Sequence, residues 1–312
     1  MLGALIIDKP EGITSHDVVA RVRRAAQTRR VGHAGTLDPF ATGVLVCCIG
    51  PATRLVQFLV GLDKEYEATV RLGYATDTQD RTGTEISPLR PSSELSIEDL
   101  HRVLKEFTGA QLQTPPMFSA KKVGGERLYR AAREGRHVER KPVNINVYSI
   151  KLLENEAPPL TDNEDGTRDF RVRLRCSSGT YVRTIAHGIG EKLGVGAHLA
   201  KLRRTEVGHF TLASALTLDE AESKGIDELN NALISPSDLL SHLPLVVLND
   251  EDNRRVINGR AVTLPEPQSL EFRPATQHMR LCDRKGDLVA VGYVDRAAGL
   301  ISPRVVLTAK DS

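Results

Sequence analysis

A glycine-rich turn around a single carboxylate is the feature that most constrains this chain. Within twelve residues, Gly32, Gly35 and Gly43 enclose Asp38, and a proline follows that aspartate directly. Glycines at this density suit a backbone that needs positive φ angles or a close approach to a ligand. Pro39 fixes its own φ and biases Asp38 away from helix, so the carboxylate has a defined place. The alternative is a surface turn in which Asp38 only caps backbone amides, a common use of aspartate.

The length of the chain allows two domains. Its 312 residues are many for one domain, and the 40% hydrophobic and 26% charged contents are ordinary for a soluble protein with real cores. No apolar run approaches the ~20 residues needed to span a bilayer. The start of the chain meets a charge at Asp8 with no basic region before it. We therefore expect a first strand there rather than a signal peptide, and a cytoplasmic protein.

Neither a metal site nor a cofactor motif is predicted. The cysteines, Cys47, Cys48, Cys176 and Cys282, show no CxxC spacing, and the nine histidines form no HExxH pattern or other ligand cluster. The phosphate-binding pattern GxxxxGK(S/T) and a strand-linked GxGxxG are missing from the sequence, as are motifs of serine or cysteine nucleophiles. The residues that remain favour a cofactor-free reaction centred on a carboxylate.

The charges are segregated along the chain, although the net charge is only +2. Residues 21–30 contain five arginines and no acid, residues 119–141 contain eight basic residues against three glutamates, and acidic residues gather at 154–169. Segregation of this kind can build a basic, nucleic-acid-binding face on a nearly neutral protein. A set of solvated helix faces would show the same pattern, and charge alone leaves both interpretations open.

Periodicity predicts a mixture of strands and helices. Residues 64–72 alternate apolar and polar in the manner of a half-buried strand, whereas 44–49 is apolar throughout. Capping boxes predict two helix starts, at Ser96–Asp99 and Thr217–Glu220. Further strands are expected at about 3–8, 143–153, 169–176 and 197–210, and further helices near 16–27, after an N-cap at Ser15, and at 180–193, ending at Gly194.

The C-terminal part has a different pattern from the rest. Short strands between about 245 and 308, with a hairpin signal at 283–287, predict a small β-barrel. The proline-containing residues 234–244 have the composition of a linker before it. Residues 154–168 are rich in proline and acid, which is typical of an exposed loop without a core of its own.

Several side chains besides Asp38 could take part in chemistry. Tyr66 lies on the alternating strand, where a tyrosine is most often amphipathic core. Arg183 follows a second glycine-containing turn; it is either solvated or buried, and a buried arginine needs a carboxylate such as Asp38. That pair would keep Asp38 ionised in an apolar pocket, because an opposite charge offsets desolvation. Tyr181 diverges from Arg183 at a helix start, and His33 could be a core residue, a switch or a stacking group.

Several sequence blocks, taken together, resemble the TruB-type tRNA pseudouridine synthases of bacteria. They occur in family order across about residues 1–240, which is far more specific than any one motif. The blocks are 32–39, 64–66, 76–83, 114–122, 125–129, 176–184 and 202–204. The C-terminal part resembles a PUA-like RNA-binding module, through 258–262 and the hairpin that leads to 302–307.

The resemblance implies an α+β fold. A catalytic domain over 1–240 would contain a central mixed or antiparallel sheet flanked by helices and loops. A small C-terminal PUA-like β-barrel that binds RNA would cover 245–308.

The resemblance also implies a reaction. Uridine-55 in the T-loop of tRNA would become pseudouridine: the N1–C1′ glycosidic bond breaks, the uracil rotates, and C5 forms the new bond, without metal, redox cofactor or ATP. Asp38 would be the nucleophile, and attack at C1′, attack on the base and elimination to a glycal all stay open. Tyr66 would stack on the flipped uracil and assist proton transfer, and Arg183 would pair with Asp38.

Binding roles follow from the same resemblance. His33 would contact the nucleotide or fill the gap left by base flipping, and Tyr181 and Leu202 would line the uracil pocket. Extruding the base costs a few kcal/mol, and basic residues can hold the RNA backbone meanwhile. Residues 119–141, hinged at Gly124-Gly125, are expected to be mobile and to order on RNA. The expected RNA-binding residues are Arg54, Lys121, Lys122, Arg127, Arg130, Arg203 and Arg204.

The expected partner is the T-stem-loop of tRNA, bound by a monomer that acts alone, with no membrane and no metal. One alternative is the archaeal and eukaryotic relative, in which a guide RNA and partner proteins select the uridine. The chain has no long basic tail, which favours stand-alone action. A second alternative is a tRNA-folding chaperone with secondary catalysis, and a third is a plain RNA-binding module. The presence of Asp38, Tyr66 and Arg183 together argues against loss of catalysis.

Overall fold

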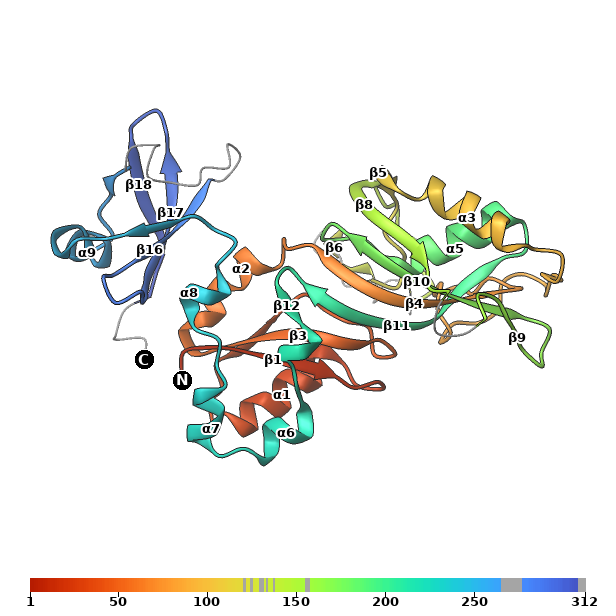
Figure 1. Ribbon diagram of the computed structural model, residues 1–312, viewed down its shortest axis with the longest axis horizontal. Helices are drawn as coiled ribbons and strands as arrows, with labels where there is room; N and C mark the ends of the chain where they lie inside the picture. Colours follow the sequence, from red (N-terminus) through yellow and green to blue (C-terminus); the bar gives the residue numbers. More distant parts are fainter. Residues whose placement is uncertain are drawn as a thin grey trace.

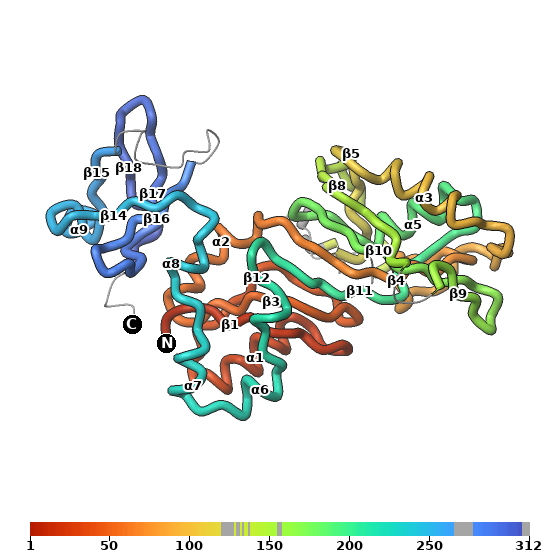
Figure 2. Tube along the Cα trace, in the orientation of Figure 1, coloured from red at the N-terminus to blue at the C-terminus, as the bar shows by residue number. Residues whose placement is uncertain are grey.

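A long sheet forms the body of the protein, and a smaller C-terminal lobe lies beside one end of it (Figure 1). The tube in Figure 2 leaves the body after helix α8 (Pro236–Leu239) and enters the lobe. The computed structural model describes residues 1–119, 122–123, 126–128, 132, 134–136, 138–154, 158–264 and 277–307, and at 122–123 and 126–127 the description covers the backbone alone.

The sheet of the body is mixed. Within the described residues it has eleven strands, most of them in the order β13-β1-β3-β11-β4-β10-β8-β5. Neighbours are antiparallel except for β1 with β13 and β3 with β11. The bounds are β1 (Gly3–Lys9), β2 (Val31–Ala34), β3 (Thr42–Ile49), β4 (Lys64–Leu72), β5 (Gly109–Gln113), β8 (Val143–Leu152), β9 (Thr161–Asp162), β10 (Arg168–Cys176), β11 (Ala197–Val207), β12 (Phe210–Thr211) and β13 (Leu216–Thr217).

The predicted strand at 64–72 is confirmed as β4. Its residues alternate between buried and half-buried, so Tyr66 and every second residue after it face a core while the glutamates between them face outward. Strand β3 is buried along nearly its whole length, as the unbroken apolar run predicts. Both strands flank β11, which places the loop before β3 next to the start of β4.

Helices cover the sheet at its two ends (Figure 1). Helices α1 and α6 pack together at the β1 end, and α3 and α5 pack together beside β8 and β11. The described helices are α1 (Ser15–Ala25), η1 (Gly50–Leu55), α2 (Val56–Leu59), α3 (Ile97–Glu106), α5 (Val182–Leu193), η2 (Leu212–Ser214), α6 (Leu218–Ser223), α7 (Ile226–Asn231), α8 (Pro236–Leu239) and α9 (Asp250–Ile257). None of these helices is long and apolar enough to cross a bilayer.

The predicted helix caps are confirmed at Ser96–Asp99 and Thr217–Glu220, and helix α5 ends at Gly194 as expected. The predicted N-cap at Ser15 is wrong by one residue. Thr14 caps α1 in a capping box with Asp17. The Ser15 hydroxyl instead donates to the Leu37 carbonyl and accepts from the Leu37 amide, at 3.1 and 2.9 Å. The Ser15 side chain, which the local sequence predicts as a helix cap, therefore forms a tertiary contact with the Asp38 loop instead.

The C-terminal lobe is a curled sheet in the order β14-β16-β17-β18-β15. The predicted hairpin at 283–287 joins β16 to β17. Neither α9 nor α8 was predicted. Helix α9 lies within the lobe, and α8 interrupts the expected linker, because Ser235 and Pro236 start a helical turn. The strand bounds are β14 (Leu245–Val247), β15 (Val262–Thr263), β16 (His278–Cys282), β17 (Leu288–Asp295) and β18 (Leu300–Val306), and a separate pair in the body is β6 (Lys122–Val123) with β7 (Glu126–Arg127).

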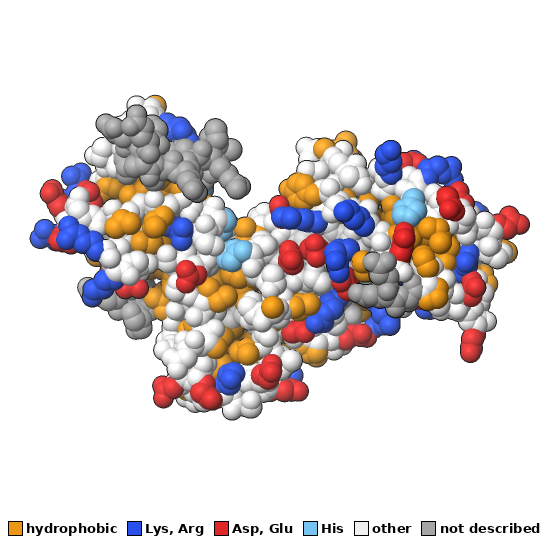
Figure 3. Space-filling view, in the orientation of Figure 1, with side chains coloured by type: hydrophobic (Ala, Val, Ile, Leu, Met, Phe, Trp, Pro, Cys, Tyr) orange, Lys and Arg blue, Asp and Glu red, His pale blue; other side chains and the backbone are white. Residues whose placement is uncertain are grey.

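The lobe shares an apolar core with the body. Leu55 and Leu59 of the body belong to the same buried cluster as Val291 and Val305 of the lobe. Arg54 adds a polar contact, because its Nη1 donates to the Val306 carbonyl at 2.7 Å. Figure 3 shows the two parts meeting along a notch, with histidine side chains gathered where they join.

Candidate active site

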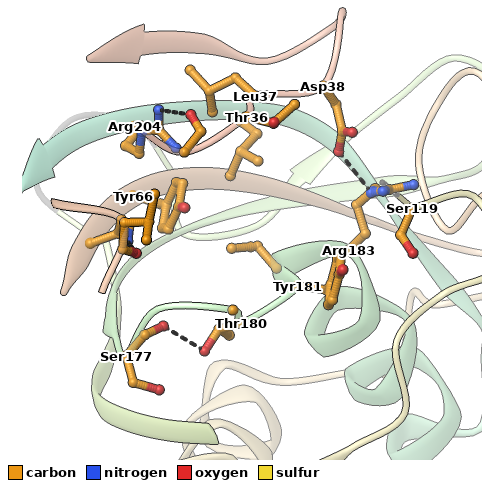
Figure 4. Close-up of a pocket in the computed structure, with 16 residues that line it drawn as sticks. Thr36, Leu37, Asp38, Tyr66, Ser119, Ser177, Thr180, Tyr181, Arg183 and Arg204 are labelled. Atoms are coloured by element: carbon orange, nitrogen blue, oxygen red, sulfur yellow. Dashed lines mark hydrogen bonds and ion pairs between the residues drawn. The ribbon is translucent and has the colours of Figure 1, made fainter. Parts of the chain in front are cut away.

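A cavity of about 290 Å³ opens in the body where β4, β11 and the start of α5 meet the Asp38 loop. Its wall contains six of the predicted site residues, Asp38, Tyr66, Tyr181, Arg183, Leu202 and Arg204. Figure 4 shows Asp38 and Arg183 joined at one side of the cavity, and Tyr66 near Arg204 at the other. The fold thus brings together residues that the sequence separates by up to about 160 positions.

The Asp38 loop is held by its backbone. Gly43 has φ +104°, and a Cβ there would lie 2.1 Å from the Arg204 carbonyl oxygen, so the close approach of β3 to β11 requires glycine. The buried Lys9 ammonium donates to the carbonyls of Pro39 and Ala41, at 3.1 and 2.7 Å. These contacts fix the loop on the C-terminal side of its carboxylate, and the two hydrogen bonds between Ser15 and Leu37 fix it on the N-terminal side. Burial lowers the pKa of Lys9 to about 8.

The predicted ion pair of Asp38 is present. Arg183 Nε lies 3.0 Å from Asp38 Oδ2. The guanidinium is buried and also donates to the carbonyls of Thr78 and Phe118, at 3.0 and 2.9 Å. Desolvation raises the pKa of Asp38 above its ordinary value, and the positive charge of Arg183 opposes the rise. The carboxylate therefore sits in a low-dielectric site with one strong cationic partner.

Sequence reasoning missed a second carboxylate on Arg183. Asp80 Oδ2 lies 3.2 Å from Arg183 Nη1, and the side chain is almost completely buried. Asp80 also accepts from the Thr78 hydroxyl and from both the amide and the hydroxyl of Thr82. The threonine-rich run at 76–83 resembles an ordinary turn. The feature of the sequence that could have identified Asp80 as buried is the pair of threonines around it, whose hydroxyls can donate hydrogen bonds to its carboxylate in place of water.

Tyr66 faces the cavity from β4. Burial raises the pKa of its phenol, and the charge of Arg204 opposes the rise. Two other wall residues were not predicted as site residues. Lys64 is buried, with its pKa lowered to about 8 by burial and by Arg204. The buried hydroxyl of Ser119 has no hydrogen-bond partner within the described part of the chain, so it is free to contact a ligand.

Arg204 requires a correction. It is predicted to bind RNA, but its side chain is only 1% exposed, so it can reach a ligand only from the cavity that it lines. The register of β11 between β3 and β4 turns it inward. Arg203, its neighbour, faces outward and pairs with Asp8 at 2.7 Å. The correct assignment needed the tertiary strand order, because both arginines belong to the same basic run.

The remaining predicted residues lie elsewhere or outside the description. His33, on β2, is half-buried and does not line the cavity; burial lowers its pKa to about 4. Arg54 lies at the junction with the C-terminal lobe. Lys121 and Arg130 lie outside the described residues, as do the side chains of Lys122 and Arg127. Part of the segment 119–141 lies outside them too, and its expected mobility and ordering on RNA stay a prediction.

No group of three or more histidine, cysteine, aspartate or glutamate side chains is placed to hold a metal ion in the part of the chain that the structure describes. The chemical groups that line the cavity include one accessible carboxylate, the phenols of Tyr66 and Tyr181, and buried cations. This set can support nucleophilic attack and can stabilise developing negative charge.

Comparison with known proteins identifies the family. Residues 23–182 match the TruB family pseudouridylate synthase N-terminal domain, and residues 183–240 match the tRNA pseudouridylate synthase B C-terminal domain. The tRNA pseudouridine synthase B of Solibacter usitatus is 43% identical over 98% of this chain and 100% of its own length. The enzyme of the same name from Bacillus velezensis is 41% identical over 99% of this chain and 98% of its own length.

A solved structure of an H/ACA RNP bound to a substrate RNA containing 2′-deoxyuridine is also similar. Its matching chain is 25% identical, with a TM-score of 0.72, over 99% of this chain and 86% of that one. The fold, the matched domains and the identities agree with one another. The chain belongs to the TruB family of pseudouridylate synthases.

Proposed function

We propose that this protein converts uridine-55 in the T-loop of tRNA into pseudouridine, with Asp38 as nucleophile and without a cofactor. The observation that carries the proposal is a single accessible carboxylate in a cavity, held by the buried Arg183 and facing Tyr66. Its relatives are named tRNA pseudouridine synthase B. Because a uridine in a stacked loop hides its glycosidic bond, the nucleotide must flip into the cavity first.

The reaction needs one bond broken and one formed. The N1–C1′ bond breaks, the detached uracil rotates, and C5 bonds to C1′; the C5 proton leaves and N1 gains a proton. Asp38 attacks C1′, attacks the base, or supports elimination to a glycal, and each of these routes uses the same carboxylate in its ionised form. Arg183 keeps it ionised and oriented.

The other wall residues hold the base while it turns. Tyr66 provides the surface on which the flipped uracil stacks, and its phenol assists proton transfer. Tyr181 and Leu202 line the pocket, and the Ser119 hydroxyl, which has no partner within the described residues, offers a hydrogen bond to a uracil oxygen. His33, one strand away, contacts a neighbouring nucleotide or fills the gap left by flipping.

RNA binding involves both parts of the molecule. We assign catalysis to residues 1–240 and RNA binding by a PUA-like module to residues 245–308, which share an apolar core and so present one continuous surface. The outward-facing Arg203 and the junction residue Arg54 are available to phosphates, although each also has a protein contact. The protein acts alone as a monomer, in the cytoplasm.

The test is the purified protein with an unmodified tRNA transcript and no other RNA or protein. Pseudouridine should form at position 55 alone, as mapped by pseudouridine-specific chemistry and sequencing. A guide-dependent enzyme is the second candidate, because the similar solved structure is an H/ACA RNP. No product on the bare transcript, with product after a guide RNA and partner proteins are added, would favour that candidate and overturn stand-alone action.

A further inference from the structure

Arg204 is a buried cation whose charge no carboxylate balances among the described residues. Its Nε donates to the Val44 carbonyl at 2.8 Å and its Nη2 to the Gly35 carbonyl at 3.0 Å. Arginine stays protonated under all ordinary conditions, and burying a cation without an anionic partner is unfavourable. Two carbonyl bonds could be made by a neutral side chain. The positive charge itself therefore needs an explanation.

The position of Arg204 is fixed from three sides. On β11 it pairs in register with Gly43 of β3 and with Tyr66 of β4. Its two hydrogen bonds reach the backbone on either side of the Asp38 loop, at Gly35 and at Val44. The guanidinium is consequently rigid relative to both the loop and the Tyr66 ring, which is the preorganisation that electrostatic stabilisation requires.

The cavity has a negative side and a positive side. Asp38 and Asp80 share Arg183 at one side. At the other side Arg204 lies near Lys64, and among the described residues the Lys64 ammonium donates to backbone carbonyls alone, those of Val60 and Leu62. Figure 4 shows Asp38 and Arg204 separated by the Thr36–Leu37 segment, with Tyr66 on the Arg204 side. A base stacked on Tyr66 would lie nearer to the positive side.

We propose that Arg204 supplies the positive charge that stabilises the uracil once it has detached from C1′. The inference rests on the proposed function. When the N1–C1′ bond breaks, its electron pair leaves with the uracil, which becomes an anion spread over N1 and the two carbonyl oxygens. That charge disappears when C5 bonds to C1′ and the C5 proton is replaced by one at N1. Arg204 thus acts on a charge that neither uridine nor pseudouridine carries.

Two substitutions separate charge from packing. Arg204→Lys keeps the cation but replaces the planar guanidinium with a shorter, differently shaped donor, whereas Arg204→Gln keeps hydrogen-bond donors but removes the charge. Arg71→Gln is the matched control, because Arg71 is a partly buried arginine of β4 that pairs with Asp169. The measurements are the single-turnover rate of pseudouridine formation at saturating tRNA, the tRNA Kd and the melting temperature.

We expect Arg204→Gln to slow the reaction by about 100-fold or more, with Kd changed by less than about threefold, and Arg204→Lys to slow it by about tenfold. Arg71→Gln should lower the melting temperature while keeping the rate. Equal rates for the lysine and glutamine variants would overturn the proposal, because packing would then explain the whole effect. A wild-type protein without activity on tRNA would instead refute the proposed function.

A substrate change provides a readout that a structural role would not affect. Fluorine at C5 withdraws electrons and stabilises the uracil anion, so it should replace part of what Arg204 does. With 5-fluorouridine at the target position, cleavage of the glycosidic bond should be slowed less by either Arg204 variant than cleavage at uridine. If Arg204→Gln does not fold, Arg204→Lys carries the test. If each Arg204 variant slowed cleavage of the glycosidic bond by the same factor with both substrates, the inference would be contradicted.

Discussion

Two loops of the body each contribute one aspartate that pairs with Arg183. The two carboxylates share this partner but differ in their exposure and in their hydrogen bonds. The side chain of Asp38 is 37% exposed, and Arg183 is its one ion-pair partner among the described residues. That of Asp80 is 4% exposed and accepts three further hydrogen bonds from Thr78 and Thr82. The lone pairs of Asp80 are occupied, whereas those of Asp38 face the cavity. The exposure of the side chain and the number of its hydrogen-bond donors, not the residue type, therefore distinguish the carboxylate that we propose as reactive from the structural one.

The two loops are also held in different ways. The loop at 76–84 is held by the side chain of its aspartate, whose hydroxyl donors lie within two residues of it. The loop at 35–43 is held by its backbone, through Lys9, Ser15 and Arg204. A carboxylate that acts as a nucleophile, as we propose for Asp38, needs its lone pairs for the substrate and so cannot use them to hold its own loop in place. The Asp38 loop therefore uses carbonyls and glycines instead.

The largest expected effect comes from removing the shared partner. Arg183→Gln leaves two carboxylates close together without their cation, and we expect a loss of about 4 kcal/mol in the free energy of unfolding together with loss of activity. Urea denaturation and a pseudouridine assay measure both. Retained stability would show that Arg183 does not bridge the two loops.

Asp80→Asn comes next. It breaks a buried ion pair, so we expect a loss of about 3 kcal/mol of stability, while activity well below the melting temperature falls less than in any Asp38 variant. Thermal denaturation and single-turnover rates check the two parts. If Asp80→Asn abolished the reaction in a fully folded protein, the comparison between a reactive and a structural carboxylate would fail.

Gly43→Ala tests the backbone attachment of the Asp38 loop. Its φ of +104° and the 2.1 Å approach of a Cβ to the Arg204 carbonyl oxygen predict a loss of about 3 kcal/mol. Gly286 in the C-terminal lobe has φ +91° with open space around it, so Gly286→Ala should lose only about 1 kcal/mol. Similar losses in the two variants would mean that the close contact with β11 is unimportant.

Asp38→Asn should have the smallest effect on stability, and of the opposite sign. The pKa of Asp38 is raised in the folded state, so the folded protein holds this proton more tightly than the unfolded chain. Above the raised pKa, the ionised Asp38 side chain therefore lowers the free energy of unfolding. Below the ordinary aspartate pKa of about 4, Asp38 is protonated in both the folded and the unfolded state and has no such effect. We expect the variant to be slightly more stable than wild type at neutral pH and equal to it in acid. Lower stability at neutral pH would reverse the assigned direction.

Local patterns in the sequence predicted much of this molecule. Alternation identified β4, and the capping boxes identified α3 and α6. The need of a buried arginine for a carboxylate made Asp38 a candidate partner of Arg183, and the family resemblance implied the pair that the structure contains. These features depend on neighbouring residues or on one strong pairwise requirement. The chain also belongs to the family that its motifs resemble.

The missed features depend on contacts distant in sequence. Arg203 and Arg204 are adjacent, and only the position of β11 between β3 and β4 decides that the second is buried. Ser15 is a good N-cap locally, but Leu37 takes its hydroxyl. Asp80 has the local sequence of a turn residue, and its partner Arg183 lies on a helix 103 residues later in the chain. In each case the tertiary structure gives the side chain a different role from the one that its local sequence predicts.

The central claim, that Asp38 is the nucleophile and not a binding group, is tested most directly on one preparation of Asp38→Asn. The tRNA Kd and the pseudouridine formed at position 55 are measured on the same sample. The account predicts a Kd within about threefold of wild type and no pseudouridine above the background of a protein-free control. Residual turnover by the variant, or loss of tRNA binding in proportion to the loss of activity, would contradict it.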